Sequence, residues 1–206
     1  MKSSPKIRLR RLSNLDIQYV KNTRRSDKFV FLSKFLTSPK QVGSVLPSSR
    51  YLTNKMLEPI DWDQVRAVAE LGAGTGVFTR AINRRMHRKA QAVIFEADPM
   101  MRNRLKEQSP NLNYWGDATE LNHALQQFGM GKLDVVFSGL PFANFEQDMR
   151  DKLLSEVVES LKPGGKFIAF QYSLQMKKQL QERFRSVKIG FVPMNVPPAF
   201  VYICQK

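Results

Sequence analysis

The sequence of 206 residues is poor in the side chains that bind metals or form disulfides, with one cysteine and two histidines. A single thiol, Cys204, cannot form a disulfide within the chain, and its apolar surroundings predict a buried core side chain. His87 and His123 are far apart and show no paired spacing with acidic residues. We therefore expect no metal site and a reducing compartment such as the cytoplasm.

Long apolar runs are also absent. No stretch approaches the roughly 20 apolar residues that a membrane-spanning helix needs. The N-terminus lacks the continuous apolar core of a secretory signal peptide. The sequence therefore predicts no spanning helix.

Acidic residues are scarce, because 18 Asp and Glu face 33 Lys and Arg, which gives a net charge of +15. Residues 1–40 contain eleven Lys and Arg and two Asp, so +9 of this excess lies in the first fifth of the chain. Apolar residues recur at helical spacing between the basic ones from Leu15 to Leu36. Two interpretations stay open: a solvated basic tail, or a surface that contacts the phosphates of nucleic acid or anionic lipid.

Segments of strand length alternate with segments of helical periodicity in the rest of the chain. We expect strands over residues 65–71, 92–96, 112–115, 134–138, 165–172, 187–192 and 199–204. Alternation of this kind predicts an α/β fold with a mostly parallel, seven-stranded sheet covered by helices on both faces. No helix separates the last two strands, so they should form an antiparallel hairpin.

The same pattern divides the chain into two parts. Residues 1–60 are expected to form a basic, amphipathic, helical segment, in which a second helix opens at residues 47–49 and runs to about Leu57. Residues 61–206 are expected to form the α/β core. Ligand should bind at the carboxyl ends of the parallel strands.

A glycine-rich motif follows the first expected strand, with Glu70, Gly72, Gly74 and Gly76 in the order E-x-G-x-G-x-G. Glycines here allow a tight turn and a close approach of the backbone to a ligand. A dinucleotide-binding loop has its third glycine at a longer offset. The motif instead resembles the loop that binds the nucleoside and methionine parts of the cofactor in class I methyltransferases. A purely structural turn is the alternative.

Polar residues follow the next two expected strands as well. Glu96 ends the second strand, where a carboxylate can accept both ribose hydroxyls of an adenosine. Asp117 and Ala118 follow the third strand, where class I methyltransferases contact the adenine, although Asp117 would also serve as a helix N-cap. Three motifs at three successive strand ends predict one adenosine pocket. They imply S-adenosylmethionine as the cofactor and S-adenosylhomocysteine as the product.

The fourth expected strand ends in Ser138, Gly139, Leu140, Pro141 and Phe142, where class I enzymes present the methyl acceptor. Enzymes that methylate amino groups in nucleic acid usually have Asn or Asp first, followed by a proline and an aromatic residue. Here Ser138 and Gly139 stand in place of the Asn or Asp, and the proline and the aromatic residue are present. We expect the first four residues at the reacting centre, Ser138 also at the cofactor, and Phe142 at the substrate.

On these motifs the chain resembles bacterial phospholipid N-methyltransferases, which convert phosphatidylethanolamine stepwise towards phosphatidylcholine. The resemblance runs from about Phe29 to the C-terminus, over the segments 39–44, 47–49, 70–80, 116–118, 138–141, 171–172 and 195–199. It implies an S-adenosylmethionine-dependent N-methyltransferase that acts on phosphatidylethanolamine at a membrane surface. From its basic and apolar residues, we also expect the N-terminal segment to dock to anionic lipid at the inner face of the bacterial cytoplasmic membrane and its C-terminal half to cap the pocket.

Phe142 departs from this family, in which an aliphatic residue is more usual, and is more typical of ribosomal RNA adenine dimethyltransferases. Methylation of RNA adenine or of another amine therefore stays an alternative. Such RNA enzymes normally add a helical RNA-binding domain after the core, and the present sequence ends at the last expected strand. We accordingly expect no stable nucleic-acid partner.

Further residues are assigned on the resemblance and on chemistry. The acceptor amine is mostly protonated at neutral pH, so Tyr19 and Tyr172 are candidates to accept its proton through water or to form a cation–π wall. The remaining candidates are Lys40 and Arg50 for the lipid phosphate, Gln41 and Gly43 for closure over the methionine end of the cofactor, and Asn195 for the substrate.

Overall fold

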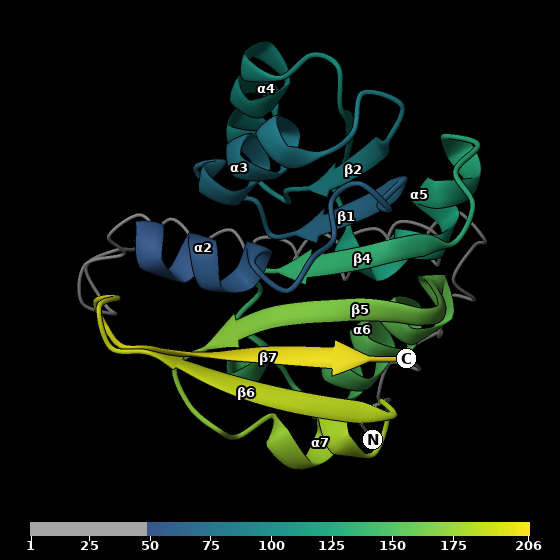
Figure 1. Cartoon of the computed structure of the whole chain (residues 1–206). Helices are drawn as coiled ribbons and strands as arrows, with labels where there is room; N and C mark the ends of the chain where they lie inside the picture. The colour runs from purple at the N-terminus through teal and green to yellow at the C-terminus, as the bar shows by residue number, and fades with distance from the viewer. Residues whose placement is uncertain (1–48) are drawn as a thin grey trace, which may run out of the picture. The chain divides into compact units, whose positions relative to one another are not determined.

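The structure is a computed structural model of the chain, and it describes residues 49–206 (Figure 1). Its helices are α2 (Arg50–Leu57), α3 (Val77–Arg85), α4 (Pro99–Gln108), α5 (Leu121–Gln127), α6 (Gln147–Ser160) and α7 (Lys177–Gln181), with short 3-10 turns η1 (Ala118–Glu120) and η2 (Phe142–Asn144). Its strands are β1 (Ala67–Leu71), β2 (Gln91–Phe95), β3 (Asn113–Trp115), β4 (Leu133–Ser138), β5 (Leu161–Gln171), β6 (Ser186–Val192) and β7 (Ala199–Gln205).

The strands form one seven-stranded sheet in the order β3-β2-β1-β4-β5-β7-β6. β1 to β5 are parallel, and β7 pairs antiparallel with both β5 and β6. The predicted fold class, including the C-terminal antiparallel hairpin, is confirmed. The strand order reverses direction between β1 and β4, and this switch point is where α/β folds of this kind bind ligands.

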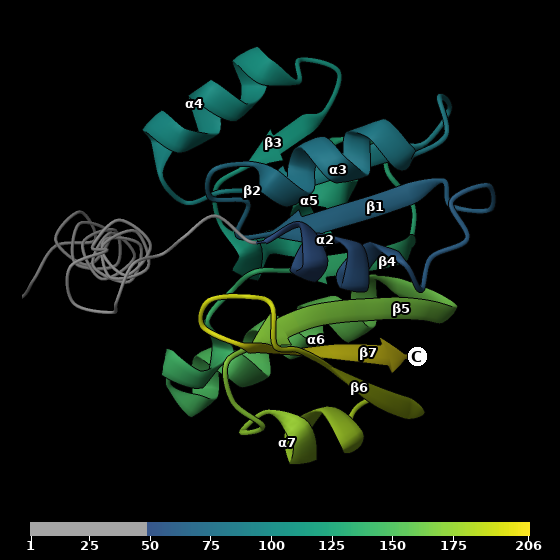
Figure 2. The ribbon, with the colours of Figure 1, turned by 60° about the vertical axis from the view of Figure 1, so that its left-hand side comes forward.

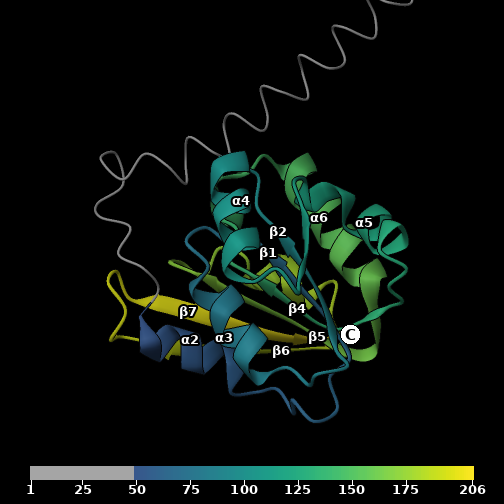
Figure 3. The same ribbon diagram turned by 90° about the horizontal axis from the view of Figure 1, so that it is seen from above.

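Helices cover both faces of the sheet. Right-handed crossovers from β1 towards β3 place their helices on one face, and crossovers from β3 through β4 to β5 place theirs on the other. Figures 2 and 3 show α2 and α3 on one side of the sheet, and α5 and α6 on the other.

Local chemistry explains where helices α2 and α4 begin. Ser49 caps α2, because its Oγ accepts a hydrogen bond from the Leu52 amide at 3.2 Å. Asp98 caps α4 by accepting from the amides of Met100 and Met101, with Pro99 in the first helical position. The expected start of α2 is thereby confirmed to within about a turn.

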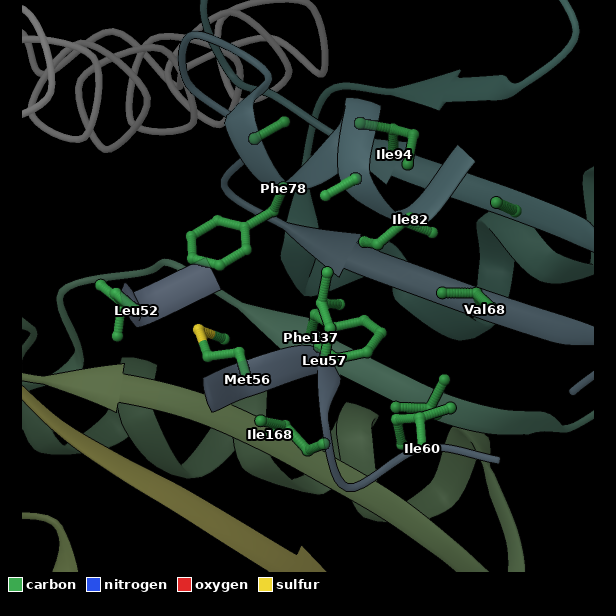
Figure 4. Close-up of a cluster of buried hydrophobic side chains, with 14 of the residues drawn as sticks. Leu52, Met56, Leu57, Ile60, Val68, Phe78, Ile82, Ile94, Phe137 and Ile168 are labelled. Carbon is green, nitrogen blue, oxygen red and sulfur yellow. The ribbon is translucent and has the colours of Figure 1, made fainter. Parts of the chain in front are cut away.

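The core between α2, α3 and the sheet is aliphatic and aromatic (Figure 4). Leu52, Met56 and Leu57 of α2 are fully buried with Phe137 of β4 and Ile168 of β5. α2 thus packs into the α/β core, whereas the sequence predicts residues 49–60 as part of the N-terminal segment. The physical reason is that one face of this short helix is apolar and covers the central strands.

Cys204 of β7 is buried as expected, and burial raises the pKa of its thiol to about 12. No helix within residues 49–206 has the length and apolar character needed to cross a bilayer. The helix expected over residues 15–36, and the candidate residues Tyr19, Lys40, Gln41 and Gly43, lie outside the described residues.

Candidate active site

The glycine loop after β1 is fixed between the ends of two neighbouring strands. The amides of Gly72 and Ala73 both donate to the Phe95 carbonyl of β2, at 2.9 and 3.0 Å. Gly72 has a left-handed φ of 78°, and a Cβ added there would lie 2.7 Å from Cδ2 of Leu140. Only glycine therefore fits at this position, where the loops after β1 and β4 meet.

Glu96, which follows β2, also binds the glycine loop, through its side chain. Its buried carboxylate accepts from the Gly74 amide at 2.7 Å and from the Asp98 amide at 2.9 Å. Burial raises the pKa of this group, and the two amide bonds oppose that rise. The carboxylate thus links the glycine loop to the end of β2. Its contact with a ribose stays a prediction.

Glu70, on β1, is buried, and only one of its two carboxyl oxygens has a hydrogen-bond partner among the described residues. Its Oε2 accepts from the Thr79 hydroxyl at 2.6 Å, and its Oε1 has no hydrogen-bond partner among residues 49–206. Burial raises the pKa of this carboxyl to about 7, against the opposing effect of the Thr79 hydroxyl. A buried carboxyl oxygen without a donor costs about 1–3 kcal/mol, so a bound donor beside Glu70 would stabilise the site.

Asp117, which follows β3, acts as an N-cap. Its Oδ1 accepts from the Thr119 amide at 2.8 Å and starts η1, while Ala118 is buried behind it. The capping alternative is therefore confirmed, and the adenine contacts of Asp117 and Ala118 stay predictions. Since β1, β2 and β3 are neighbours in the sheet, the three predicted cofactor motifs do lie along one edge.

The loop after β4 is held by polar groups on both sides of one residue. Ser138, the last residue of β4, is buried, and its Oγ accepts from the Leu140 amide at 3.2 Å. Gln171, the last residue of β5, donates its Nε2 to the Leu140 carbonyl at 2.8 Å. Gln171 is a positioning residue that sequence reasoning missed as part of the site. The available signal was a polar residue at the end of a buried strand.

A row of aromatic rings passes beside this loop. Phe78 of α3 lies 5.9 Å from Phe170 of β5, and Phe170 lies 5.8 Å from Tyr172, measured between ring centroids. A Cβ added at Gly139 would lie 3.0 Å from the Gly72 carbonyl oxygen and 3.5 Å from the Phe170 ring. Gly139 therefore allows the row, the acceptor loop and the glycine loop to lie in contact. Phe78 and Phe170 were not predicted from the sequence.

Tyr172 ends this row and is 53% exposed, so its ring is open to a ligand. Partial burial raises the pKa of its phenol above the ordinary value. The side chain is consequently neutral at physiological pH. A neutral ring is suited to a cation–π wall, whereas the proton-acceptor alternative would need the less favoured phenolate or a water.

Two predicted substrate residues are buried and make structural contacts. Phe142 is 1% exposed and packs against Phe145 and Phe167, at 6.0 and 6.1 Å between ring centroids. This burial argues against the predicted contact of Phe142 with the substrate. Asn195 is 4% exposed, accepts from the Ser49 amide at 3.1 Å and donates to the Pro197 carbonyl at 2.8 Å. Its amide therefore fastens the β6–β7 loop to the start of α2.

Arg50 is exposed in the first turn of α2, and its guanidinium lies 5.2 Å from the ring centroid of Tyr51. It lines a shallow surface pocket together with Arg84 and Arg85 of α3. The group is basic and open, as a phosphate contact would require, and that contact stays a prediction.

The arrangement fits an adenosyl cofactor with an amino group. The backbone at Gly74 is open, because a Cβ added there meets nothing within 4 Å. Glu96 lies beside this space, because it accepts from the Gly74 amide, and the unpaired oxygen of Glu70 can accept a hydrogen bond. When bound, S-adenosylmethionine supplies a methyl group carried on a sulfonium.

Comparisons with known proteins agree with this geometry. Residues 68–165 match the family described as "Methyltransferase domain". The chain is 34% identical over 184 residues to an ornithine lipid N-methyltransferase of Singulisphaera acidiphila, covering 87% of this chain and 96% of that protein.

Solved structures show the same fold at low identity. The N-methyltransferase NodS of Bradyrhizobium japonicum, in complex with S-adenosyl-l-homocysteine, has a TM-score of 0.62 at 12% identity, covering 86% of this chain and 97% of its own. Precorrin-6y C5,15-methyltransferase of Geobacter metallireducens has a TM-score of 0.62 at 12% identity, covering 80% and 92%.

Fold and site together define a class I methyltransferase, with S-adenosylmethionine as its cofactor. Within that class, the chain belongs to the family of S-adenosylmethionine-dependent N-methyltransferases that includes the Singulisphaera enzyme.

Proposed function

We propose that the enzyme transfers methyl groups from S-adenosylmethionine to the amine of a membrane lipid, with ornithine lipid as the leading substrate. The observation that carries this proposal is the 34% identity to an ornithine lipid N-methyltransferase over nearly its whole length. The sequence motifs independently favour phosphatidylethanolamine as the second candidate. Both headgroups carry a primary ammonium close to an anion, which is a carboxylate in one and a phosphate in the other.

The acceptor loop would position the amine for attack on the methyl group. Ser138 and Gln171 fix the amide and the carbonyl of Leu140, so the loop is rigid before the substrate arrives. Positioning of this kind contributes much of the rate in a simple transfer, because it removes the entropic cost of bringing the reactants into line. The chain's main contribution to the chemistry is therefore geometric.

The amine must also lose a proton, since an alkyl ammonium has a pKa of about 10. Among the described residues, Tyr172 connects to the acceptor loop through Phe170, whose ring lies 5.8 Å from that of Tyr172 and 3.5 Å from a Cβ added at Gly139. Its neutral phenol would hold the ammonium against the ring face while the proton leaves to water. As methyl groups are added, the same wall would hold the increasingly bulky cation.

Transfer of labelled methyl to vesicles that contain ornithine lipid or phosphatidylethanolamine tests the proposal, with total RNA as a parallel acceptor. We expect label in ornithine lipid, and the product distribution counts the methyl groups. Label in phosphatidylethanolamine alone would move the substrate to the second candidate. Label in RNA alone would overturn a lipid substrate. A Gly72→Ala variant, prepared identically, controls for a contaminating methyltransferase.

A further inference from the structure

Exposed apolar side chains of the described residues gather at one edge of the sheet. Seven of the eight large apolar residues that are exposed lie at the carboxyl ends of the parallel strands, and only Ile189 lies away from that edge. Six of these seven are near β5, β6, β7 and the start of α2, and we call them the hairpin patch: Tyr51, Tyr172, Leu174, Phe191, Met194 and Val196. The loops of the candidate active site, which follow β1, β2, β3 and β4, lie at this same edge.

Strand pairing shows that the members of the hairpin patch are neighbours. Phe191 pairs with Phe200, which also pairs with Gln171, so the residues after β5 lie beside the β6–β7 loop. The hydrogen bond from the Ser49 amide to Asn195 joins the same loop to the start of α2. Figures 1 and 2 show the β6–β7 loop beyond the sheet, next to the first turn of α2.

Asn195 determines which way its neighbours point. Its side chain is buried and bonded on two sides, while Met194 is 62% exposed and Val196 is 65% exposed. The loop therefore presents two apolar side chains outward from a fastened backbone. A convex apolar tip of this kind is suited to insertion into a soft apolar phase.

The segments that carry the hairpin patch have an excess of basic residues. Residues 49–57, 172–181 and 186–200 contain no Asp or Glu, and their five basic residues are Arg50, Lys55, Lys177, Lys178 and Lys188. Two of these lysines reach acidic residues just outside the segments, Lys55 to Glu58 at 3.4 Å and Lys178 to Glu182 at 4.0 Å. Apolar side chains flanked by exposed Lys and Arg complement an anionic lipid surface.

We propose that the hairpin patch is a membrane-contact surface, which inserts Met194, Val196 and Phe191 at the boundary of headgroups and acyl chains of an anionic bilayer. Tyr51 and Tyr172 would lie at headgroup level, where tyrosine is favoured because one end of its ring is apolar and the other polar. The inference rests on the proposed function, because a lipid amine reaches the candidate active site only if this edge of the sheet faces the bilayer.

Vesicle binding of the full chain tests the proposal without any methyl acceptor. Vesicles of phosphatidylcholine and phosphatidylglycerol contain no primary amine, so binding to them is independent of which lipid is methylated. We expect M194S/V196S to lower the vesicle partition coefficient about tenfold, since two inserted side chains are lost. The matched control is M100S/I189S, which removes two exposed apolar side chains outside the patch and should bind like the unchanged protein.

A second readout follows the patch directly. Cys204 is buried with a raised pKa, so a fluorophore can be attached selectively at Met194→Cys or at the control Met100→Cys. On adding vesicles, we expect a blue shift at position 194 and none at position 100. Thermal unfolding by circular dichroism checks that each variant is folded.

Several results would overturn the proposal. Equal binding of M194S/V196S and the control would show that the patch does not contact lipid. If the molecular mass in solution rises with protein concentration, and this rise is lost in M194S/V196S, the hairpin patch would be a contact with a second copy of the chain. If the label at position 194 is already shielded from water without vesicles, the hairpin patch would be assigned to contact with residues 1–48. If the patch binds vesicles but no lipid is methylated, the membrane surface stands and the proposed function fails.

Discussion

The two halves of the site edge are built differently. Along β1, β2 and β3, the groups are buried carboxylates and backbone amides, such as Glu96 with Gly74 and Glu70 with Thr79. Along β4 to β7, they are aromatic rings and exposed apolar side chains around a few fixed amides. The first half suits a polar cofactor that is the same for the whole class, and the second suits an amphipathic acceptor. Substitutions in one half at a time therefore test whether the function of the other half is affected.

The largest effect is expected at Gly72, where the halves meet. Gly72→Ala places a Cβ 2.7 Å from Cδ2 of Leu140 in a left-handed backbone, so the glycine loop is strained and the Leu140 side chain must move. We expect cofactor affinity and activity to fall by about two orders of magnitude, because a displacement of about 1 Å at a reacting centre costs that much. Isothermal titration with S-adenosylhomocysteine and a methyl-transfer assay measure the two quantities.

Gly129→Ala is the matched control, because Gly129 also has a positive φ but no atom lies within 4 Å of its added Cβ. It should lower stability by about 1 kcal/mol through backbone strain alone. Its cofactor affinity should be unchanged. Equal losses in the two variants would mean that strain, not the contact with Leu140, explains the effect.

Glu70 gives the cofactor half a pH dependence. Its folded pKa of about 7 is above the unfolded value of about 4.5, so the folded state binds more protons between these values. Its contribution to stability is therefore most favourable below about pH 4.5 and declines as pH rises through about 7. The total change is roughly 3 kcal/mol, at about 1.4 kcal/mol for each pKa unit.

Urea unfolding of the cofactor-free protein at pH 5 and pH 8 measures this effect, with Glu70→Gln as the comparison. The amide keeps an acceptor for Thr79 and does not titrate. We expect Glu70→Gln to gain stability relative to the unchanged protein as the pH rises from 5 to 8. A constant difference between the two proteins would refute the raised pKa.

The two halves of the site edge differ in how much of their structure could be predicted from the sequence. Strand bounds were predicted well because alternation and capping are local. β5 is the exception, since it begins at Leu161 and not near Gly165. Leu161 pairs with Leu133 of β4, and the register of the two strands shifts just after this pair. The glycine loop and the three strand-end motifs also depend on short segments, so they were found together.

The acceptor half depends on contacts between distant residues. The Gln171–Leu140 bond joins residues 31 apart, and the Ser49–Asn195 bond joins residues 146 apart. No local pattern specifies such pairs. The burial of Phe142 was missed for the same reason, because a resemblance to a motif does not state which way a ring packs.

Gln171 tests whether the acceptor loop can be disturbed alone. Gln171→Leu removes the donor to the Leu140 carbonyl but keeps a buried side chain of similar size. We expect kcat to fall about tenfold, consistent with the loss of one positioning hydrogen bond worth about 1.4 kcal/mol, while S-adenosylhomocysteine affinity stays within about twofold. Gln171→Met, an unbranched side chain of similar length that also lacks the donor, should match it. A loss of cofactor affinity in both would show that the halves are coupled.

The smallest effect is expected at Tyr172, and it separates two roles for one ring. If the ring is a wall for the ammonium, Tyr172→Phe should keep activity within about twofold, whereas Tyr172→Ala should lose about tenfold with most of the change in KM for lipid. If the hydroxyl accepts the proton, Tyr172→Phe should instead lower kcat across the pH range. Initial rates at several lipid concentrations and pH values distinguish these outcomes. The raised pKa of the phenol favours the wall, because burial keeps the ring neutral at physiological pH, where the amine substrate is charged.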